Sequence, residues 1–133
     1  MTKEKLKQYV ETKREIKIIE EKIEYLKEKK TSIKSMTISD MPRSGGNTEN
    51  DRLGALLGEI EELIDIYNEK QIKLMKQQKK IEDTIEQLDN AIERNIMRLR
   101  YLEGHKWENI CVEVGYSWEG IHKVHRRILN KIK

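Results

Sequence analysis

The chain has 133 residues, of which 38% are charged and 36% hydrophobic, and its formal net charge is +3. This length allows one or two small domains with a modest core. A single cysteine and the lack of a long apolar run exclude a disulfide framework and a membrane span. The first residues also lack the apolar segment of a signal peptide, so we expect a cytoplasmic protein with no membrane partner.

The charge is distributed unevenly along the chain. Residues 1–90 contain 18 basic and 19 acidic side chains, whereas residues 91–133 contain nine basic and five acidic ones. The basic excess therefore lies in the last third of the chain. A localised excess of this kind indicates a polyanionic partner such as double-stranded DNA.

Apolar residues repeat at heptad spacing through the first part of the chain. Two series have the spacing of the a and d positions of a coiled coil, namely Tyr9, Ile16 and Ile23, and Ile19, Leu26 and Ile33. They predict a long helix up to about residue 36. The polar segment that follows contains the only proline, Pro42, and the pair Gly45 and Gly46, which predicts a loop over residues 37–50.

A second heptad pattern follows this loop and predicts another long helix over residues 51–88. Its two series are Leu53, Ile60, Tyr67, Leu74, Ile81 and Leu88, and Leu57, Ile64, Gln71, Gln78, Ile85 and Ile92. Two helices of similar length joined by a polar loop predict an antiparallel hairpin. Residues 1–89 are thus expected to form a coiled-coil oligomerisation region, in which loop 37–50 is either a plain connector or a functional loop.

Additional apolar residues widen the stripe near the start of the second helix. They are Leu56, Leu63 and Ile66. A stripe wider than a two-position seam needs a further partner helix, and a second copy of the chain is the simplest source. We therefore expect a homodimer or a higher homo-oligomer, with Gln71 and Gln78 in the seam setting the register.

Residues 90–133 have the pattern of three short helices. Asn90 and Glu93 have the spacing of a capping box, and the first of these helices is expected to end at Gly104. The second is expected to end at Gly115, and Ser117 is a suitable N-cap for the third. The segment "VGYS" between them has the length and the glycine of the turn in DNA-binding helix-turn-helix domains. The expected fold is all-α, a long helical hairpin followed by a three-helix helix-turn-helix domain.

Particular residue types recur along this segment. They are Leu99-Arg100-Tyr101, Glu103-Gly104, Trp107-Glu108, Ile110, Gly115, Ser117, Ile121 and Leu129. At these positions, over about forty residues, the chain resembles the C-terminal promoter-reading domain of the sigma-70 family. The whole chain resembles small phage and prophage transcription regulators of the ArpU and RinA type, which carry such a domain. Trp118 and Gly120 depart from the sigma-like pattern at the start of the third helix.

The resemblance implies that the third helix is a recognition helix. Its inward face is expected to contain Ile121, Val124, Ile128 and Leu129, and its groove-facing residues Trp118, Glu119, His122, Lys123 and Arg126. Glu119 stands where the sigma-like pattern has a glutamate that accepts from cytosine, and Lys123 can donate to guanine. Arg126, Arg127 and Lys131 are expected to neutralise phosphates. The alternative is a solvated cationic face without a reading function.

No residue pattern indicates catalysis, a cofactor or a metal site. His105, His122, His125 and Cys111 do not have the spacing of paired metal ligands. His125 is expected to take part in helix packing or to contact a phosphate. Phosphate-binding loops, nucleophile motifs and carboxylate pairs in an apolar setting are also missing from the sequence.

The sequence thus predicts a DNA-binding transcription regulator that controls late genes of a phage or prophage. One alternative is a DNA-recognition subunit of phage packaging machinery, which would also join such a domain to coiled helices. A second alternative is an adaptor that contacts RNA polymerase without binding DNA.

Overall fold

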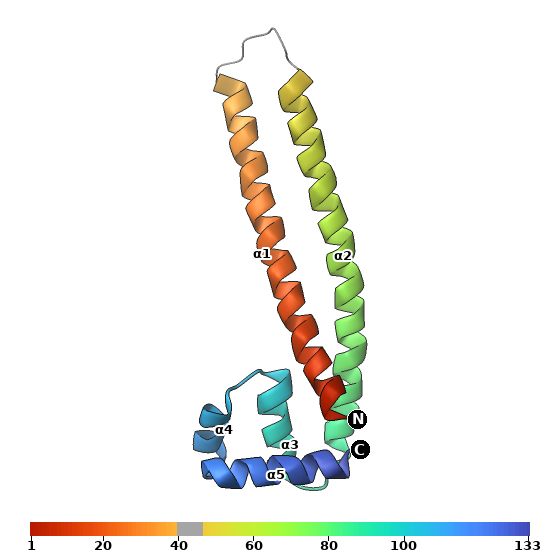
Figure 1. Cartoon of the computed structure of the whole chain (residues 1–133), viewed down its shortest axis with the longest axis vertical. Helices are drawn as coiled ribbons and strands as arrows, with labels where there is room; N and C mark the ends of the chain where they lie inside the picture. Colours follow the sequence, from red (N-terminus) through yellow and green to blue (C-terminus); the bar gives the residue numbers. More distant parts are fainter. Residues whose placement is uncertain (40–46) are drawn as a thin grey trace. The chain divides into compact units, whose positions relative to one another are not determined.

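The computed structural model describes residues 1–39 and 47–133, and its regular structure over these ranges is helical, without strands. The elements are α1 (Lys3–Ser39), α2 (Asn47–Glu86), α3 (Ala91–Met97), the π-helical segment η1 (Arg98–Leu102), α4 (Trp107–Val114) and α5 (Trp118–Lys131) (Figure 1). The predicted all-α fold with a long N-terminal helix pair is confirmed. No helix in the described ranges is long and apolar enough to cross a membrane. The chain divides into two compact units. One consists of residues 14–72, and the other consists of residues 1–13 together with residues 73–133.

The two long helices extend further into the predicted loop than the sequence indicates. Residues 37–39 still belong to α1, and residues 47–50 already belong to α2. Serine, threonine and asparagine are tolerated in the terminal turns of a helix, so the polar composition of residues 37–39 and 47–50 does not exclude helix there. Residues 40–46, the remainder of the predicted loop 37–50, lie outside the described residues.

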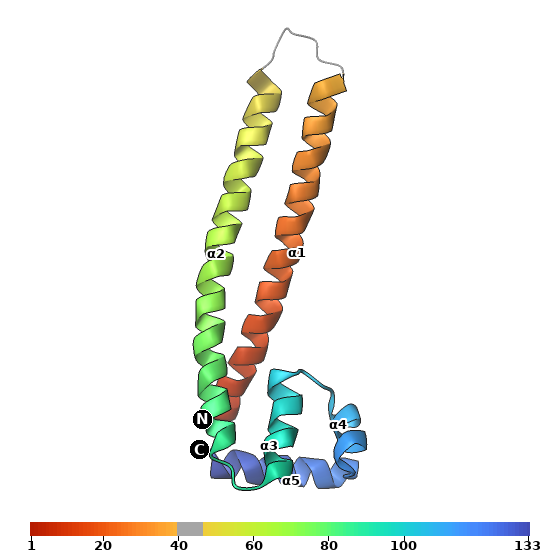
Figure 2. The ribbon, with the colours of Figure 1, turned by 180° about the vertical axis from the view of Figure 1, so that it is seen from behind.

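Within residues 14–72, α1 and α2 run antiparallel and side by side (Figures 1 and 2). The Tyr67 hydroxyl donates to a carboxylate oxygen of Glu20 at 2.9 Å and accepts from the Gln71 amide at 2.9 Å. Lys70 pairs with Glu15 at 2.6 Å. Because Gln71 lies in the seam, its amide is satisfied by this small network rather than left unpaired, as a partly buried polar group requires.

The widened apolar stripe of α2 is covered in part by α1 of the same chain. Leu56 and Ile60 are buried with Leu26, and Ile33 and Leu63 pack partly buried against them. Leu56 therefore needs no second copy of the chain to leave solvent, and the expectation of a homo-oligomer loses this part of its basis. The reason is that Leu26 and Ile33 of α1 face the stripe within the hairpin.

The other unit has one hydrophobic core, to which the start of α1, the end of α2 and all the C-terminal helices contribute (Figure 2). Its buried residues are Leu6, Tyr9, Ile81, Ile85, Leu88, Ile96, Met97, Tyr101, Ile110, Ile121, Val124 and Ile128. The ammonium group of Lys13 also donates to the backbone carbonyl of Leu102 at 2.7 Å. The sequence predicts a boundary between residues 89 and 90, whereas the compact unit begins within α2 at residue 73 and includes residues 1–13.

The start and the end of the α3–η1 helix follow the local sequence. The side chain of Asn90 accepts from the backbone N–H groups of Ile92 at 2.8 Å and Glu93 at 3.3 Å, as an N-cap does. At the other end, Gly104 adopts a φ of 73°, a left-handed conformation that favours glycine after a helix. The predicted termini of this helix are confirmed.

Candidate nucleic-acid interface

The connection between α4 and α5 is short and depends on one glycine. Gly115 lies in the left-handed region at φ 73° and ψ 29°, and its N–H donates to the carbonyl of Cys111 at 2.9 Å. The N–H of Tyr116 reaches the same carbonyl at 3.2 Å, which closes the C-terminus of α4. Ser117 then starts α5, because its hydroxyl accepts from the N–H of Gly120 at 3.1 Å.

Gly120 lies beside this cap. A Cβ atom at Gly120 would lie 3.0 Å from the Ser117 hydroxyl oxygen and 3.7 Å from the Tyr116 ring. A larger residue at this position therefore requires the Ser117 hydroxyl to move by a few tenths of an ångström.

The inward face of α5 is the one that the sequence predicts. Ile121, Val124 and Ile128 are buried, and Leu129 packs partly buried against the same core. His125 is also buried on this face. These residues fix α5 on α3 and α4 and leave the opposite side of the helix to solvent.

Four of the predicted site residues lie on the exposed side of α5. They are Trp118, Glu119, Lys123 and Arg126. The Trp118 side chain is 55% exposed, although it is large and apolar. Within the described residues, Glu119, Lys123 and Arg126 have no ion-pair partner, so their charges are available to an external ligand.

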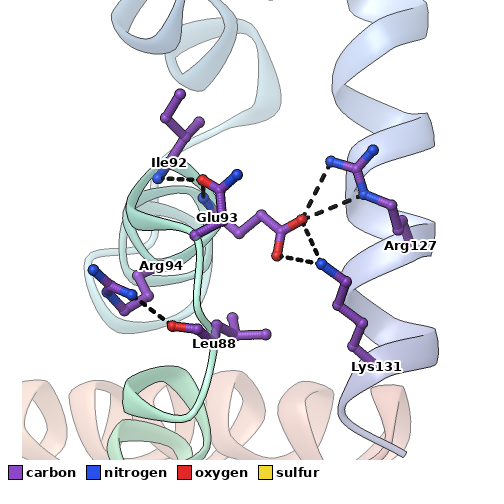
Figure 3. Close-up of polar contacts among 7 residues, drawn as sticks. Leu88, Ile92, Glu93, Arg94, Arg127 and Lys131 are labelled. Carbon is purple, nitrogen blue, oxygen red and sulfur yellow. Dashed lines mark hydrogen bonds and ion pairs between the residues drawn. The ribbon is translucent and has the colours of Figure 1, made fainter.

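Arg127 and Lys131, which the sequence assigns to phosphates, are bound to a carboxylate of the protein (Figure 3). Glu93 of α3 is only 2% exposed, and Lys131 donates to both of its carboxylate oxygens at 3.0 Å. Arg127 donates to one of these oxygens from Nε at 3.3 Å and from an Nη atom at 3.2 Å. We name these three residues the Glu93 cluster. It lies on the flank of α5 that faces α3 (Figure 3).

The sequence does not reveal this role of Glu93. Its position three residues after Asn90 predicts a capping-box contact to the backbone, and its carboxylate instead accepts from side chains 34 and 38 residues later in the chain. The only available signal is that a glutamate of α3 and two cations one helical turn apart on α5 could pair if these helices pack together.

His125 and Tyr101 form the buried end of a column of aromatic rings. His125 Nε2 and the Tyr101 hydroxyl share a hydrogen bond of 2.6 Å. Burial lowers the pKa of His125 to about 4, and the charges of Lys3, Arg100 and His122 act in the same direction. Burial also raises the pKa of Tyr101 to about 12, against the opposing effect of Arg100. Both side chains are therefore neutral at physiological pH, and His125 has a packing role rather than a phosphate-binding one.

The column continues outward to the exposed side of α5. Trp107 packs on His125 with ring centroids 4.6 Å apart and meets His122 edge-on at 5.3 Å. His122 in turn meets Trp118 edge-on at 4.5 Å. The guanidinium of Arg100 lies over the Trp107 ring at 4.8 Å, a cation–π contact. His122, predicted to face the groove, thus supports the exposed Trp118.

No group of three or more His, Cys, Asp or Glu residues in the described ranges could hold a metal ion. Cys111 is partly buried, and its thiol lies 3.8 Å from the carbonyl of Ser117.

No family model matches the chain, and searches of the curated proteins and of the solved structures find no significant match.

Proposed function

We propose that this protein is a sequence-specific DNA-binding transcription regulator in which α4, the turn at Gly115 and α5 form a helix-turn-helix and α5 is the recognition helix. The observation that carries the proposal is the exposed side of α5, where Lys123 and Arg126 have no ion-pair partner within the described residues. The short turn and the Ser117 cap support it, since they have the chemistry of such domains.

The charge pattern favours DNA over a generic solvated face. A helix that is cationic only for solubility gains nothing from a sharp division into paired and unpaired cations. On α5, Arg127 and Lys131 neutralise Glu93 inside the fold, whereas Lys123 and Arg126 remain on the open side together with Glu119. A carboxylate among cations is useful in a DNA groove where it accepts from the amino group of cytosine.

The proposed biological role is control of late genes in a phage or prophage, which the resemblance to the ArpU and RinA type of regulator supports. We also propose that the protein acts as a homodimer or a higher homo-oligomer, since helix-turn-helix proteins commonly read two half-sites with two copies. Exposed apolar residues of the long helices, among them Ile18, Tyr25 and Ile66, are available for such contacts.

The test is selection of binding sites from a randomised pool of duplex DNA, followed by fluorescence anisotropy on the selected site. The wild type should enrich a defined motif, and Lys123→Ala should bind it about 5- to 150-fold more weakly, because one base-edge contact is worth about 1–3 kcal/mol. Lys17→Ala, at an exposed lysine of α1, is the matched control and should bind like the wild type.

Three outcomes separate the alternatives. Absence of any enriched motif, with Lys123→Ala equal to the wild type, would contradict the proposal. Retention of RNA polymerase in a pull-down without DNA binding would favour the adaptor. A selected motif that lies at a packaging site of the encoding genome, and that leaves a late-promoter reporter unchanged, would favour the packaging subunit.

A further inference from the structure

The column of rings from Tyr101 to Trp118 ends in a solvent-exposed tryptophan that the core does not need. Trp118 is 55% exposed, and its ring meets that of His122 edge-on, with the ring centroids 4.5 Å apart. His122 is itself held by Trp107, which packs on buried His125. A large apolar side chain that is both exposed and braced by other rings loses little conformational entropy when it binds a ligand.

We propose that Trp118 determines specificity by placing its indole ring against the C5-methyl group of a thymine in the major groove. This inference rests on the proposed function and deepens it. Trp118 is the first residue of α5, and the N-terminal residues of a recognition helix are those that contact base edges. Thymine is the base that presents an apolar group there, and apolar side chains read it by contact.

The neighbouring residues favour DNA over a protein surface as the partner of Trp118. It precedes Glu119, which can accept only from a donor such as cytosine N4, and the unpaired cations Lys123 and Arg126 follow five and eight residues later on the same helix. A protein partner that buried the ring would also have to satisfy these three charges. A DNA groove satisfies all of them, because phosphates flank its donors, acceptors and methyl groups.

The test replaces thymine by deoxyuridine, which lacks the methyl group, at each thymine of the selected site in turn. For the wild type, one or two positions should lose affinity by about fourfold, as expected for one buried methyl group. Trp118→Ala should bind more weakly overall and show no difference between thymine and deoxyuridine at those positions. Trp118→Phe should keep part of the difference, because the phenyl ring is still an apolar surface.

Two further variants make the test specific. Val112→Ala removes another exposed apolar side chain, which is 84% exposed on α4, and should leave the thymine preference unchanged. His122→Ala should weaken the preference without abolishing it, because Trp118 loses its brace but keeps its position. In Trp107→Phe, Trp118 is the remaining tryptophan, so the fluorescence of this variant reports on the Trp118 environment and should change when the selected DNA site is added.

The inference and the proposed function can fail separately. If the wild type enriches a motif but no thymine is sensitive to deoxyuridine, the inference is wrong and the proposed function stands. It is equally wrong if Trp118→Ala keeps the wild-type sensitivity, which would leave Trp118 to a protein partner. If the wild type binds no DNA, both fail.

Discussion

Removing the buried and the exposed members of the Glu93 cluster should affect stability very differently. Glu93 is 2% exposed, whereas Arg127 and Lys131 are 57% and 50% exposed. After Glu93→Gln, the two cations can be solvated where they are, so we expect a loss of about 1 kcal/mol from the missing charge-assisted hydrogen bonds. The double change Arg127→Met and Lys131→Met instead leaves a buried carboxylate without a cation, which costs about 3 kcal/mol or more.

The stability of the single methionine variants should depend on which hydrogen bonds to Glu93 each variant loses. Lys131 contacts both carboxylate oxygens at 3.0 Å, whereas both bonds from Arg127 go to one oxygen at 3.2 and 3.3 Å. Either single methionine leaves one cation in place, so we expect a loss of about 1–2 kcal/mol, larger for Lys131→Met. The triple variant, with glutamine at position 93 and methionine at both cation positions, should be more stable than the double methionine variant.

The assay is urea unfolding followed by circular dichroism at 222 nm. The cluster lies in the unit formed by residues 1–13 and 73–133, so the unfolding transition of that unit should move to lower urea concentration in the destabilised variants. The explanation is refuted if the double methionine variant is no less stable than Glu93→Gln. It is also refuted if the triple variant does not recover stability over the double one, because the cost would then come from lost packing rather than from an uncompensated charge.

The remaining predictions concern acid sensitivity and the turn. The pKa of His125 is about 4 in the fold and about 6.5 when unfolded, so the unfolded chain binds the proton first and stability falls as the pH decreases from about 6.5 to 4. Because solvent screens part of this effect, we expect the free energy of unfolding to fall by about 1–2 kcal/mol over this pH range. Urea unfolding at several pH values measures this loss, which should be absent in His125→Gln. Gly115→Ala should cost about 1–2 kcal/mol at its positive φ, whereas Gly58→Ala, in the open interior of α2, should stabilise by about 0.5–1 kcal/mol in thermal unfolding. A destabilising Gly58→Ala would contradict the open helical environment of Gly58, and a neutral Gly115→Ala would contradict the left-handed backbone conformation of Gly115.

Local chemistry made much of the fold predictable. Heptad spacing is a property of neighbouring turns, so it predicted the long helices, although their ends were misplaced by several residues. Gly104, Gly115 and Ser117 act through contacts within a few residues, so the helix ends that they determine could be read from the sequence. The inward face of α5 followed from a spacing of three and four for the same reason.

Contacts between distant segments were not predictable. Nothing in the sequence near Leu6 and Tyr9 indicates that they join the core around α5, because heptad spacing does not specify which partner a helix meets. The π-helical segment η1 was also missed. Ile92, predicted as a seam residue of the second long helix, lies instead in the separate helix α3 and is exposed.

The same limit explains why the candidate site was only partly anticipated. Sequence spacing places Arg126 and Arg127 as neighbours on a cationic helix, and it led us to expect that both would neutralise phosphates. The distinction comes from Glu93, 34 residues earlier than Arg127, which becomes a partner only when α3 packs beside α5. Likewise, the position of Trp118 is readable from the sequence, whereas its support by His122 and Trp107 is a property of the folded structure.

Arg126 and Arg127 form a matched pair that tests the division of α5 into two sides. Arg126 is exposed and has no ion-pair partner in the described part of the chain, so Arg126→Ala should change stability by less than about 0.5 kcal/mol. If α5 binds DNA as proposed, the same change removes a phosphate contact and lowers the slope of log affinity against log salt by about one unit.

Arg127→Ala should have the opposite pair of effects. The free energy of unfolding should fall by about 1–2 kcal/mol, and the salt slope of DNA binding by the folded protein should stay unchanged, because the Arg127 guanidinium is held by Glu93. Urea unfolding and salt titrations of DNA binding on the two variants measure both effects. Equal salt slopes in the two variants would show that Arg127 leaves Glu93 for a phosphate when DNA binds, and the two sides of α5 would then not be separate.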